Sequence, residues 1–228
     1  MTARARSTGT VLNLCFHGIG TPGRNLEAEE GRFWVGVNQF DEMLSVIRGH
    51  PSVRITFDDG NASDAGVALP ALAKWGLKAS FFVVAARLGA PGSLTMGDLR
   101  ELVRAGMTVG SHGMHHRSWR TLGRMALREE LSEARRSIAI ATGQPVTQAA
   151  CPYGFYDRRV LSELRRSGFA RVYTSDGGPA RPHSWLQSRY VVQRQDTPEF
   201  IEDLACRPRG TFVASAVRIV KCSIKQLR

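Results

Sequence analysis

Two adjacent carboxylates end an apolar run in the segment Ile55-Thr56-Phe57-Asp58-Asp59-Gly60. Consecutive side chains of an extended strand point to opposite faces, so both acids can reach one site only where the pleat breaks. Gly60 would permit that break, because glycine readily leaves the ordinary φ range. Two unpaired carboxylates are costly when close together, which indicates a bound cation or a shared proton. The alternative is an Asp-Asp-Gly turn with both acids solvated.

Three of the six histidines lie within five positions, in the segment Gly110-Ser111-His112-Gly113-Met114-His115-His116. The four-residue spacing of His112 and His116 predicts two imidazoles on one face of a helical turn. With one Asp they would bind a metal and leave positions open for water and substrate. Such a metal polarises a carbonyl oxygen and lowers the pKa of a bound water towards about 7. The remaining Asp could then take a proton from that water.

A third segment, Ala150-Cys151-Pro152-Tyr153-Gly154, ends another predicted strand in a tight turn. A backbone N–H of such a turn can face the oxyanion that develops on an attacked carbonyl. One donor of this kind is typically worth about 2.7 to 4 kcal/mol in the transition state. Because Pro-Tyr-Gly turns are also common as plain loop structure, this segment gains weight only from the other two.

Apolar, β-branched runs alternate with helical patterns along the chain, which is typical of βα units around a parallel sheet. The predicted strands are residues 11–16, 53–57, 79–84, 107–110, 147–151, 171–173 and 190–192. The predicted helices are residues 39–48, 64–75, 96–105, 125–141, 158–167 and 198–204. We therefore expect the α/β class, as a single domain built on a distorted (β/α) barrel of about seven parallel strands.

Local signals mark several helix ends. Thr95 followed by Asp98 resembles a capping box, and Asp157 could cap a later helix. Glycines stand where left-handed C-terminal residues belong, at Gly76, Gly106, Gly143 and Gly168. Pro70 predicts a kink or a late start in its helix. Two irregular stretches, residues 18–34 and 175–188, have a length that is usually functional in a compact domain.

The chain of 228 residues, 43% hydrophobic and 22% charged, fits one globular domain with a sizeable core. We divide it into a basic tail (1–10), the folded domain (11–205) and a second basic tail (206–228). The apolar run at 11–16 is too short and polar for a signal peptide, and no stretch approaches a membrane span. We expect a cytoplasmic protein whose scattered cysteines are free thiols: Cys15, Cys151, Cys206 and Cys222.

The net charge is +11, from 31 Lys and Arg against 20 Asp and Glu, and such a field attracts polyanions of any kind. No block of five or six like charges occurs, so an Arg-rich composition is the plain alternative. In the C-terminal tail, apolar residues from Phe212 to Leu227 follow one helical stripe. This tail either packs on the domain or makes weak contact with an anionic membrane at its inner face. We do not expect nucleic acid as a partner.

The three segments, in this order and spacing, resemble the NodB-type polysaccharide deacetylases, which are the family 4 carbohydrate esterases. The resemblance covers about residues 11–192 and implies a distorted (β/α) barrel that hydrolyses an N-acetyl group. It implies Asp58 as the catalytic base and the backbone N–H of Tyr153 as an oxyanion contact. The implied ligands of one divalent metal, expected to be zinc, are Asp59, His112 and His116. His115 has no place in the motif, and we expect it to flank the site.

Two positions depart from the family pattern. Three residues before Tyr153, where the family often has an Arg that orients the catalytic Asp, this chain has Ala150, and Arg189 could substitute. The family's general acid is usually a His near the C-terminus, but no histidine follows His183. His17 closes the first predicted strand, as in the biofilm poly-N-acetylglucosamine deacetylases, which this arrangement resembles and in which the acid-bearing strand comes first. We therefore expect His17 as the general acid of a permuted motif, with a structural histidine as the alternative.

The expected function is that of a hydrolase of non-peptide carbon–nitrogen bonds, which removes acetyl from an N-acetylhexosamine unit of a saccharide or glycoconjugate. Trp34, Trp119 and Trp185 lie near predicted strand ends, where indoles either stack on sugars or pack in the core. Two alternatives remain, hydrolysis of a non-sugar amide and a non-catalytic basic binding protein on the same barrel. The expected cytoplasmic location favours a precursor over a finished extracellular polymer.

Overall fold

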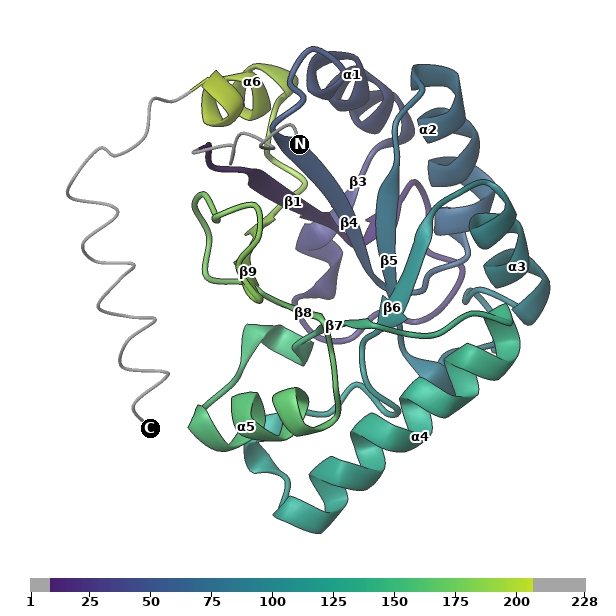
Figure 1. Cartoon of the computed structure of the whole chain (residues 1–228). Helices are drawn as coiled ribbons and strands as arrows, with labels where there is room; N and C mark the ends of the chain where they lie inside the picture. Colours follow the sequence, from purple (N-terminus) through teal and green to yellow (C-terminus); the bar gives the residue numbers. More distant parts are fainter. Residues whose placement is uncertain (1–8, 207–228) are drawn as a thin grey trace, which may run out of the picture.

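Residues 9–206, the part of the chain that the computed structural model describes, form an α/β fold around one parallel sheet (Figure 1). The sheet has eight strands in the order β10-β1-β4-β5-β6-β7-β8-β9, and its neighbours are parallel. These strands are β1 (Leu12–Phe16), β4 (Val53–Asp59), β5 (Ala79–Val83), β6 (Thr108–Ser111), β7 (Gln148–Ala150), β8 (Arg171–Thr174), β9 (Leu186–Ser188) and β10 (Tyr190–Val191). The predicted class, single domain and distorted barrel are confirmed.

Side-chain contacts close the barrel between β1 and β9, which do not pair as strands. The side-chain nitrogen Nδ2 of Asn13 donates to the Ser188 carbonyl at 2.9 Å and to Gln187 Oε1 at 3.1 Å. Beyond the start of β1, Val11 and Ala180 form an antiparallel bridge with two hydrogen bonds of 2.8 Å. The sheet is therefore nearly closed.

Helices cover the outside of the sheet (Figure 1). The α-helices are α1 (Val37–Ile47), α2 (Leu69–Trp75), α3 (Met96–Arg104), α4 (Arg124–Thr142), α5 (Arg158–Arg166) and α6 (Pro198–Cys206). Shorter turns are η1 (Glu30–Phe33), η2 (Asp64–Ala68), η3 (Ala85–Arg87), η4 (Trp119–Thr121) and η5 (Pro152–Gly154). Between sheet and helices lies the main apolar core, in which the rings of Phe57 and Phe81 stack with centroids 4.6 Å apart.

The alternation of side chains along each strand makes the barrel interior polar. On β4, Ile55 and Phe57 belong to the outer apolar core. Their neighbours Thr56 and Asp58 are buried on the inner side, where both contact the Arg189 guanidinium. Buried polar groups must be hydrogen-bonded to be tolerated, so the interior constrains its side chains tightly.

The structure differs from the sequence predictions in local elements. The strand β9 lies in the stretch 175–188 that we expected to be a loop, which raises the strand number from seven to eight. The stretch 18–34 contains β2 (Gly18–Ile19), and this strand pairs with β3 (Trp34–Val35). The predicted helix 64–75 opens with the π-helical turn η2, and Pro70 lies in the first turn of α2 that follows. The predicted late start is therefore confirmed.

Other local predictions are confirmed. Thr95 and Asp98 form the capping box of α3, and Asp157 accepts the Val160 N–H at the start of α5. Cys15 and Cys206 are free thiols. No helix within residues 9–206 is both long and apolar enough to cross a membrane. Predictions on residues 1–8 and 207–228, including Cys222 and the apolar stripe, lie outside the described residues.

Candidate active site

Asp58 and Asp59 occupy the carboxyl end of β4, and both are buried. A regular strand would turn Asp59 away from Asp58, but its φ of 77° puts it in the left-handed region, followed by Gly60 with φ 72°. The pleat therefore breaks one residue earlier than predicted, at Asp59 itself. The Cβ of a larger residue at Gly60 would lie 3.1 Å from the Val83 side chain, so glycine also fits the space.

The segment from His112 to His116 is not helical, so the predicted reason for its histidine spacing is wrong. It is a loop after β6, with φ of 85° at Gly113 and 52° at His116. The buried Glu130 on α4 fixes this loop by accepting the N–H of Met114 at 3.0 Å and that of His115 at 2.9 Å. The two imidazoles converge because of these left-handed turns, whereas the His115 side chain is exposed.

The three predicted metal ligands lie together. Asp59 Oδ1 is 3.7 Å from His112 Nε2 and 3.3 Å from His116 Nε2. At Zn–N and Zn–O lengths of 2.0 to 2.2 Å, tetrahedral ligand atoms are separated by about 3.3 Å, which these distances approach. Asp59 Oδ1 is buried without a hydrogen-bond partner in the described structure, as an atom intended for a cation would be. The donor set therefore fits a divalent metal.

The charges of this group suit a metal ligand set. Burial lowers the pKa of His112 to about 4, with Asp58 acting in the opposite direction, so the ring is neutral as ligation requires. Burial alone would raise the pKa of Asp59, but the nearby histidines, first His17 and then His116, lower it below its ordinary value. His112 Nδ1 lies 3.0 Å from the Ala150 carbonyl oxygen, which leaves Nε2 to face Asp59.

Arg189 and Asp58 form a bidentate ion pair. Its Nη1 and Nη2 donate to the two carboxylate oxygens of Asp58, each at 2.6 Å, and Nε donates to the Thr174 carbonyl at 3.2 Å. The guanidinium is fully buried and lies over the rings of Phe82 and Tyr173. Burial by itself would raise the pKa of Asp58, but the charge of Arg189 lowers it well below the ordinary range. The carboxylate therefore stays ionised and fixed in orientation.

His17 lies beside the two acids. A ring nitrogen of His17, the Cys15 sulfur and a carboxylate oxygen of Asp58 all lie within 4.8 Å of one another. The ring stacks on Phe33 with centroids 5.0 Å apart, and its buried Nδ1 has no hydrogen-bond partner among the described residues. The structure thus brings His17 to the site, at the carboxyl edge of β1 where an α/β barrel gathers its functional groups.

Tyr153 stands at the pocket mouth in a left-handed conformation with φ 57°. Its ring is half-exposed and lies 4.5 Å from that of His116 and 6.2 Å from that of Phe155, centroid to centroid. Phe155 is also half-exposed, and sequence reasoning missed it. Together the rings of Tyr153 and Phe155 form an exposed aromatic surface beside the predicted metal ligands.

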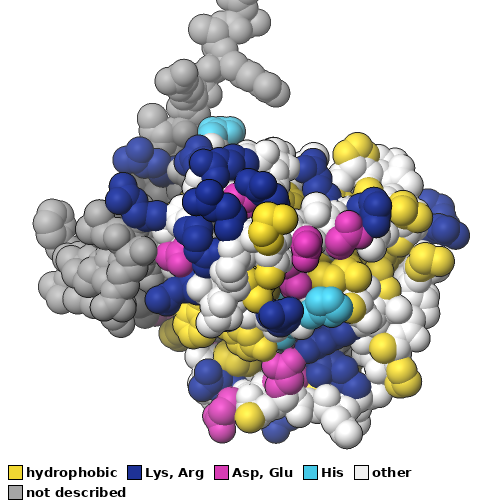
Figure 2. Space-filling view, turned by 90° about the horizontal axis from the view of Figure 1, so that it is seen from below, with side chains coloured by type: hydrophobic (Ala, Val, Ile, Leu, Met, Phe, Trp, Pro, Cys, Tyr) yellow, Lys and Arg dark blue, Asp and Glu magenta, His cyan; other side chains and the backbone are white. Residues whose placement is uncertain are grey.

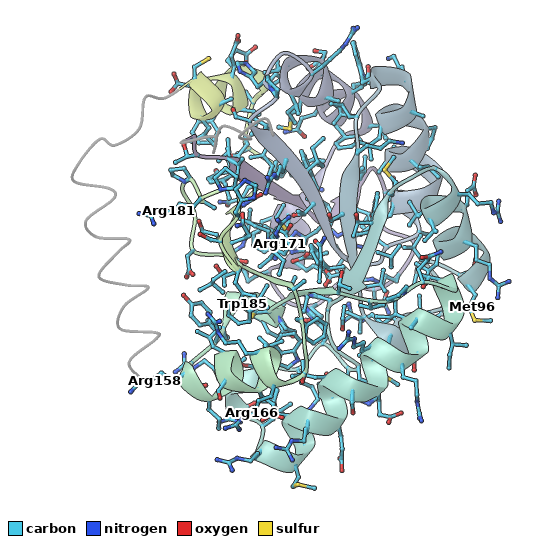
Figure 3. The ribbon with its side chains drawn as sticks, viewed as in Figure 1. Met96, Arg158, Arg166, Arg171, Arg181 and Trp185 are labelled. Atoms are coloured by element: carbon cyan, nitrogen blue, oxygen red, sulfur yellow. The ribbon has the colours of Figure 1, made fainter. Side chains whose placement is uncertain are left out.

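None of the three tryptophans provides such a surface. Trp34 and Trp119 are fully buried, so they pack in the interior. Trp185, labelled in Figure 3, precedes β9; its Nε1 donates to the Phe169 carbonyl at 2.8 Å, and the Arg165 guanidinium covers its ring at 4.1 Å. All three tryptophans therefore pack against other protein groups and do not offer a ring face for stacking on sugars.

Glu27, from the long stretch 18–34, is the main site residue that sequence reasoning missed. Its Oε1 lies 3.3 Å from His116 Nδ1 and also pairs with Arg87, while Oε2 lies 3.1 Å from the Tyr153 hydroxyl. No motif marks this residue, because its three partners are 60 to 126 positions away in the chain.

All these groups surround one pocket. Figure 2 views the molecule from below Figure 1, and this face carries acidic, basic and histidine side chains among apolar ones. Its lining includes His17, Glu27, Phe33, Asp58, Asp59, His112, His116 and Tyr153. The described non-glycine residues with positive φ are Glu29, Asp59, His116 and Tyr153, and all four line this pocket. Such conformations cost about 1 to 3 kcal/mol each and cluster at functional sites.

A nearly closed parallel barrel thus brings two histidines and two aspartates together at its carboxyl edge, with a donor set that fits one divalent metal. The chain belongs to the polysaccharide deacetylase family, whose model matches residues 46–172. It is 32% identical over 154 residues to the chitooligosaccharide deacetylase of Sinorhizobium fredii (strain NBRC 101917 / NGR234), covering 65% of this chain and 68% of that protein. His17 and Arg189 lie outside the residues matched by the family model.

A second relative is YxkH of Bacillus subtilis (strain 168), whose name assigns it to the polysaccharide deacetylases. It is 28% identical over 142 residues, covering 62% of this chain and half of that protein's length. The fold is shared with the Streptococcus pyogenes deacetylase PplD in complex with acetate, with TM-score 0.76, 20% identity and coverage of 88% of this chain and 99% of that one. It is also shared with IcaB from Ammonifex degensii, with TM-score 0.74, 22% identity and coverage of 87% and 97%.

Proposed function

We propose that this chain is a metal-dependent deacetylase that hydrolyses the acetamide of an N-acetylhexosamine unit in a saccharide or glycoconjugate. The observation that carries the proposal is the convergence of Asp59, His112 and His116 at metal-binding separations, beside an Asp58 that Arg189 holds ionised. The name of the Sinorhizobium relative supports an N-acetylated sugar as substrate. The reaction forms a C–O bond to the acetyl carbon, breaks its C–N bond and yields acetate and a free amine.

In this mechanism Asp59, His112 and His116 hold the metal. When bound, the metal polarises the acetyl oxygen and acidifies the attacking water. Asp58 acts as general base and accepts a proton from that water, which is a role worth roughly 10² to 10⁴-fold in rate. Arg189 supplies the orienting contact that the family pattern places elsewhere.

The backbone N–H of Tyr153 binds the oxyanion of the tetrahedral intermediate in our proposal. His17 is the general acid, because an amine is a poor leaving group unless it is protonated. Its position within 4.8 Å of Asp58 supports this role. The first strand then carries the acid, as in a permuted motif.

We infer that zinc is the ion, since a donor set of one carboxylate and two imidazoles suits it. Elemental analysis of the purified protein gives the identity and stoichiometry, with His116→Ala as the variant that should lose the metal. A stoichiometric metal other than zinc would correct the identity, and a metal content unchanged in His116→Ala would reject the ligand assignment.

Acetate release from a panel of N-acetylated oligosaccharides, glycoconjugate precursors and non-sugar acetamides tests the substrate class. We expect turnover of the sugars, and none by Asp58→Asn. Turnover confined to non-sugar amides would favour the alternative function, hydrolysis of a non-sugar amide. No turnover and no bound metal would favour a binding protein on the same barrel.

We further propose that residues 206–228 make a weak contact with an anionic membrane surface on the cytoplasmic side. Eight of the 31 Lys and Arg, but none of the 20 Asp and Glu, lie in residues 1–8 and 207–228, so most of the +11 excess belongs to the two ends. Binding to anionic vesicles should fall with added salt, because screening weakens exposed charges. Vesicle binding that survives deletion of 207–228 would reject this contact.

A further inference from the structure

The Glu27 carboxylate joins three elements that follow three different strands. His116 comes from the loop after β6, Arg87 from η3 after β5, and Tyr153 from η5 after β7. The Tyr153 hydroxyl also lies 3.2 Å from the His116 carbonyl oxygen, so its one proton is shared between that oxygen and Glu27. A single side chain thus contacts a metal-ligating residue and the residue of the oxyanion turn.

The loop that carries Glu27 is held by a partly buried ion pair. Glu30 is buried, pairs with Arg24 through both carboxylate oxygens, and accepts the Glu27 N–H at 2.8 Å. Arg24 also donates to Asn61 Oδ1 at 3.1 Å, two residues after Asp59. Contacts to the segment that follows β4 therefore fix the position of Glu27. This indicates that the contact between Glu27 and His116 is a defined part of the fold.

The two metal-ligating histidines are supported differently. His112 Nδ1 lies against a backbone oxygen, that of Ala150, whereas the partner of His116 Nδ1 is the side chain of Glu27. A hydrogen bond from Nδ1–H to a carboxylate selects the tautomer whose Nε2 carries a free lone pair. His116 Nε2 is the atom that faces Asp59 Oδ1 at 3.3 Å. A side-chain partner, unlike a backbone oxygen, can be removed by substitution.

We propose that Glu27 is a positioning residue that fixes the His116 ring and tautomer for metal binding and ties this ring to the Tyr153 turn. The proposal rests on the metal assignment of the proposed function. Such outer carboxylates typically contribute 10- to 100-fold in metal affinity. Because the Glu27 side chain is 42% exposed, water can replace part of its effect, and we expect a loss near the lower figure.

The first test measures metal affinity. The chelator-treated full chain is titrated with zinc in the presence of a competing indicator. Glu27→Ala should weaken binding about tenfold or more, while Glu27→Gln, which keeps a neutral acceptor, should lose less. The matched control is Glu133→Ala on α4, which removes a carboxylate of similar exposure, 46%, that also pairs with an arginine, Arg136, but does not line the pocket. The control should stay within about twofold of the parent.

The tautomer of His116 is the second readout. Nitrogen-15 NMR of the metal-free protein at alkaline pH, where imidazole is neutral, should show the proton on Nδ1 in the parent and a shift towards Nε2 in Glu27→Ala. If Glu27→Ala proved unfolded by circular dichroism, Glu27→Gln would carry both measurements.

Three results would overturn the proposal. They are parent-like affinity and tautomer in Glu27→Ala, equal losses in Glu27→Ala and Glu133→Ala, and failure of the parent itself to bind metal. In the first two cases the parent still binds metal, so the metal assignment stands and only the role of Glu27 fails. In the third the metal assignment itself fails.

Discussion

Replacing Arg189 by Met should destabilise the metal-free protein by about 3 to 5 kcal/mol, the range for removing one partner of a buried ion pair. Arg189 is fully buried, and Asp58 is 3% exposed, so the carboxylate would remain in the interior without its counter-charge. Met would still fill the space beside Phe82 and Tyr173, which separates the loss of charge from the loss of packing. In a chain of this size each kcal/mol shifts Tm by about 2 to 4 °C, so Tm should fall by roughly 6 to 20 °C.

Urea and thermal unfolding of chelator-treated protein measure this cost. Arg135→Met is a suitable control, because Arg135 also lies over a ring, that of Phe169 at 5.1 Å, but bonds a backbone carbonyl instead of a carboxylate. The control should cost about 1 kcal/mol. Adding Asp58→Asn to Arg189→Met should recover stability, since the uncompensated charge is then gone.

Acid should reduce the difference between parent and Arg189→Met. Arg189 lowers the pKa of Asp58 against the effect of burial, so the stability from this pair is present above the unfolded pKa of about 3.9. It is lost as pH falls through the lower folded-state value. A cost for Arg189→Met below about 1 kcal/mol at neutral pH, or no recovery in the double variant, would refute the reasoning.

Four further variants test the proposed catalytic, metal-binding and substrate-binding roles. Asp58→Asn should keep the metal and lose roughly 10² to 10⁴-fold in kcat, whereas Asp59→Asn should weaken the metal itself; equal metal loss in both, by elemental analysis, would contradict this division. His17→Ala should keep fold and metal but lower kcat strongly, and unchanged kcat would leave His17 a structural residue. Phe155→Ala should raise KM for oligosaccharides by about 2- to 10-fold, on the scale of aromatic contact energies, and KM for a monosaccharide much less. Equal effects on both substrates would argue against a sugar contact at Phe155.

Much of the site could be predicted because its chemistry lies at strand ends. The carboxyl edge of a parallel barrel collects such residues regardless of their separation in sequence, and this brought His17 and Arg189 to the Asp58 carboxylate. Arg189 could be named in advance because the position three residues before Tyr153 holds Ala150, so the buried acid needed another partner.

The sequence could not show how the loops turn. The His112 and His116 rings lie together, but not for the predicted reason, since left-handed residues and the Glu130 contacts replace the expected helix. Glu27 meets its partners only through tertiary structure, and no local pattern encodes that. The strand β9 was missed because Leu186-Gln187-Ser188 is short and partly polar, and its pairing with β8 decides its conformation.

The four non-glycine residues with left-handed backbone around the pocket lower the stability of the folded state. Asp59, His116 and Tyr153 would each relax if replaced by Gly, and together they hold several kcal/mol that the barrel does not need for its own integrity. In the proposed function they supply two metal ligands and the oxyanion turn, which accounts for the strain. A relative of this fold that does not carry out the reaction would have no need of left-handed residues other than glycine at these three positions.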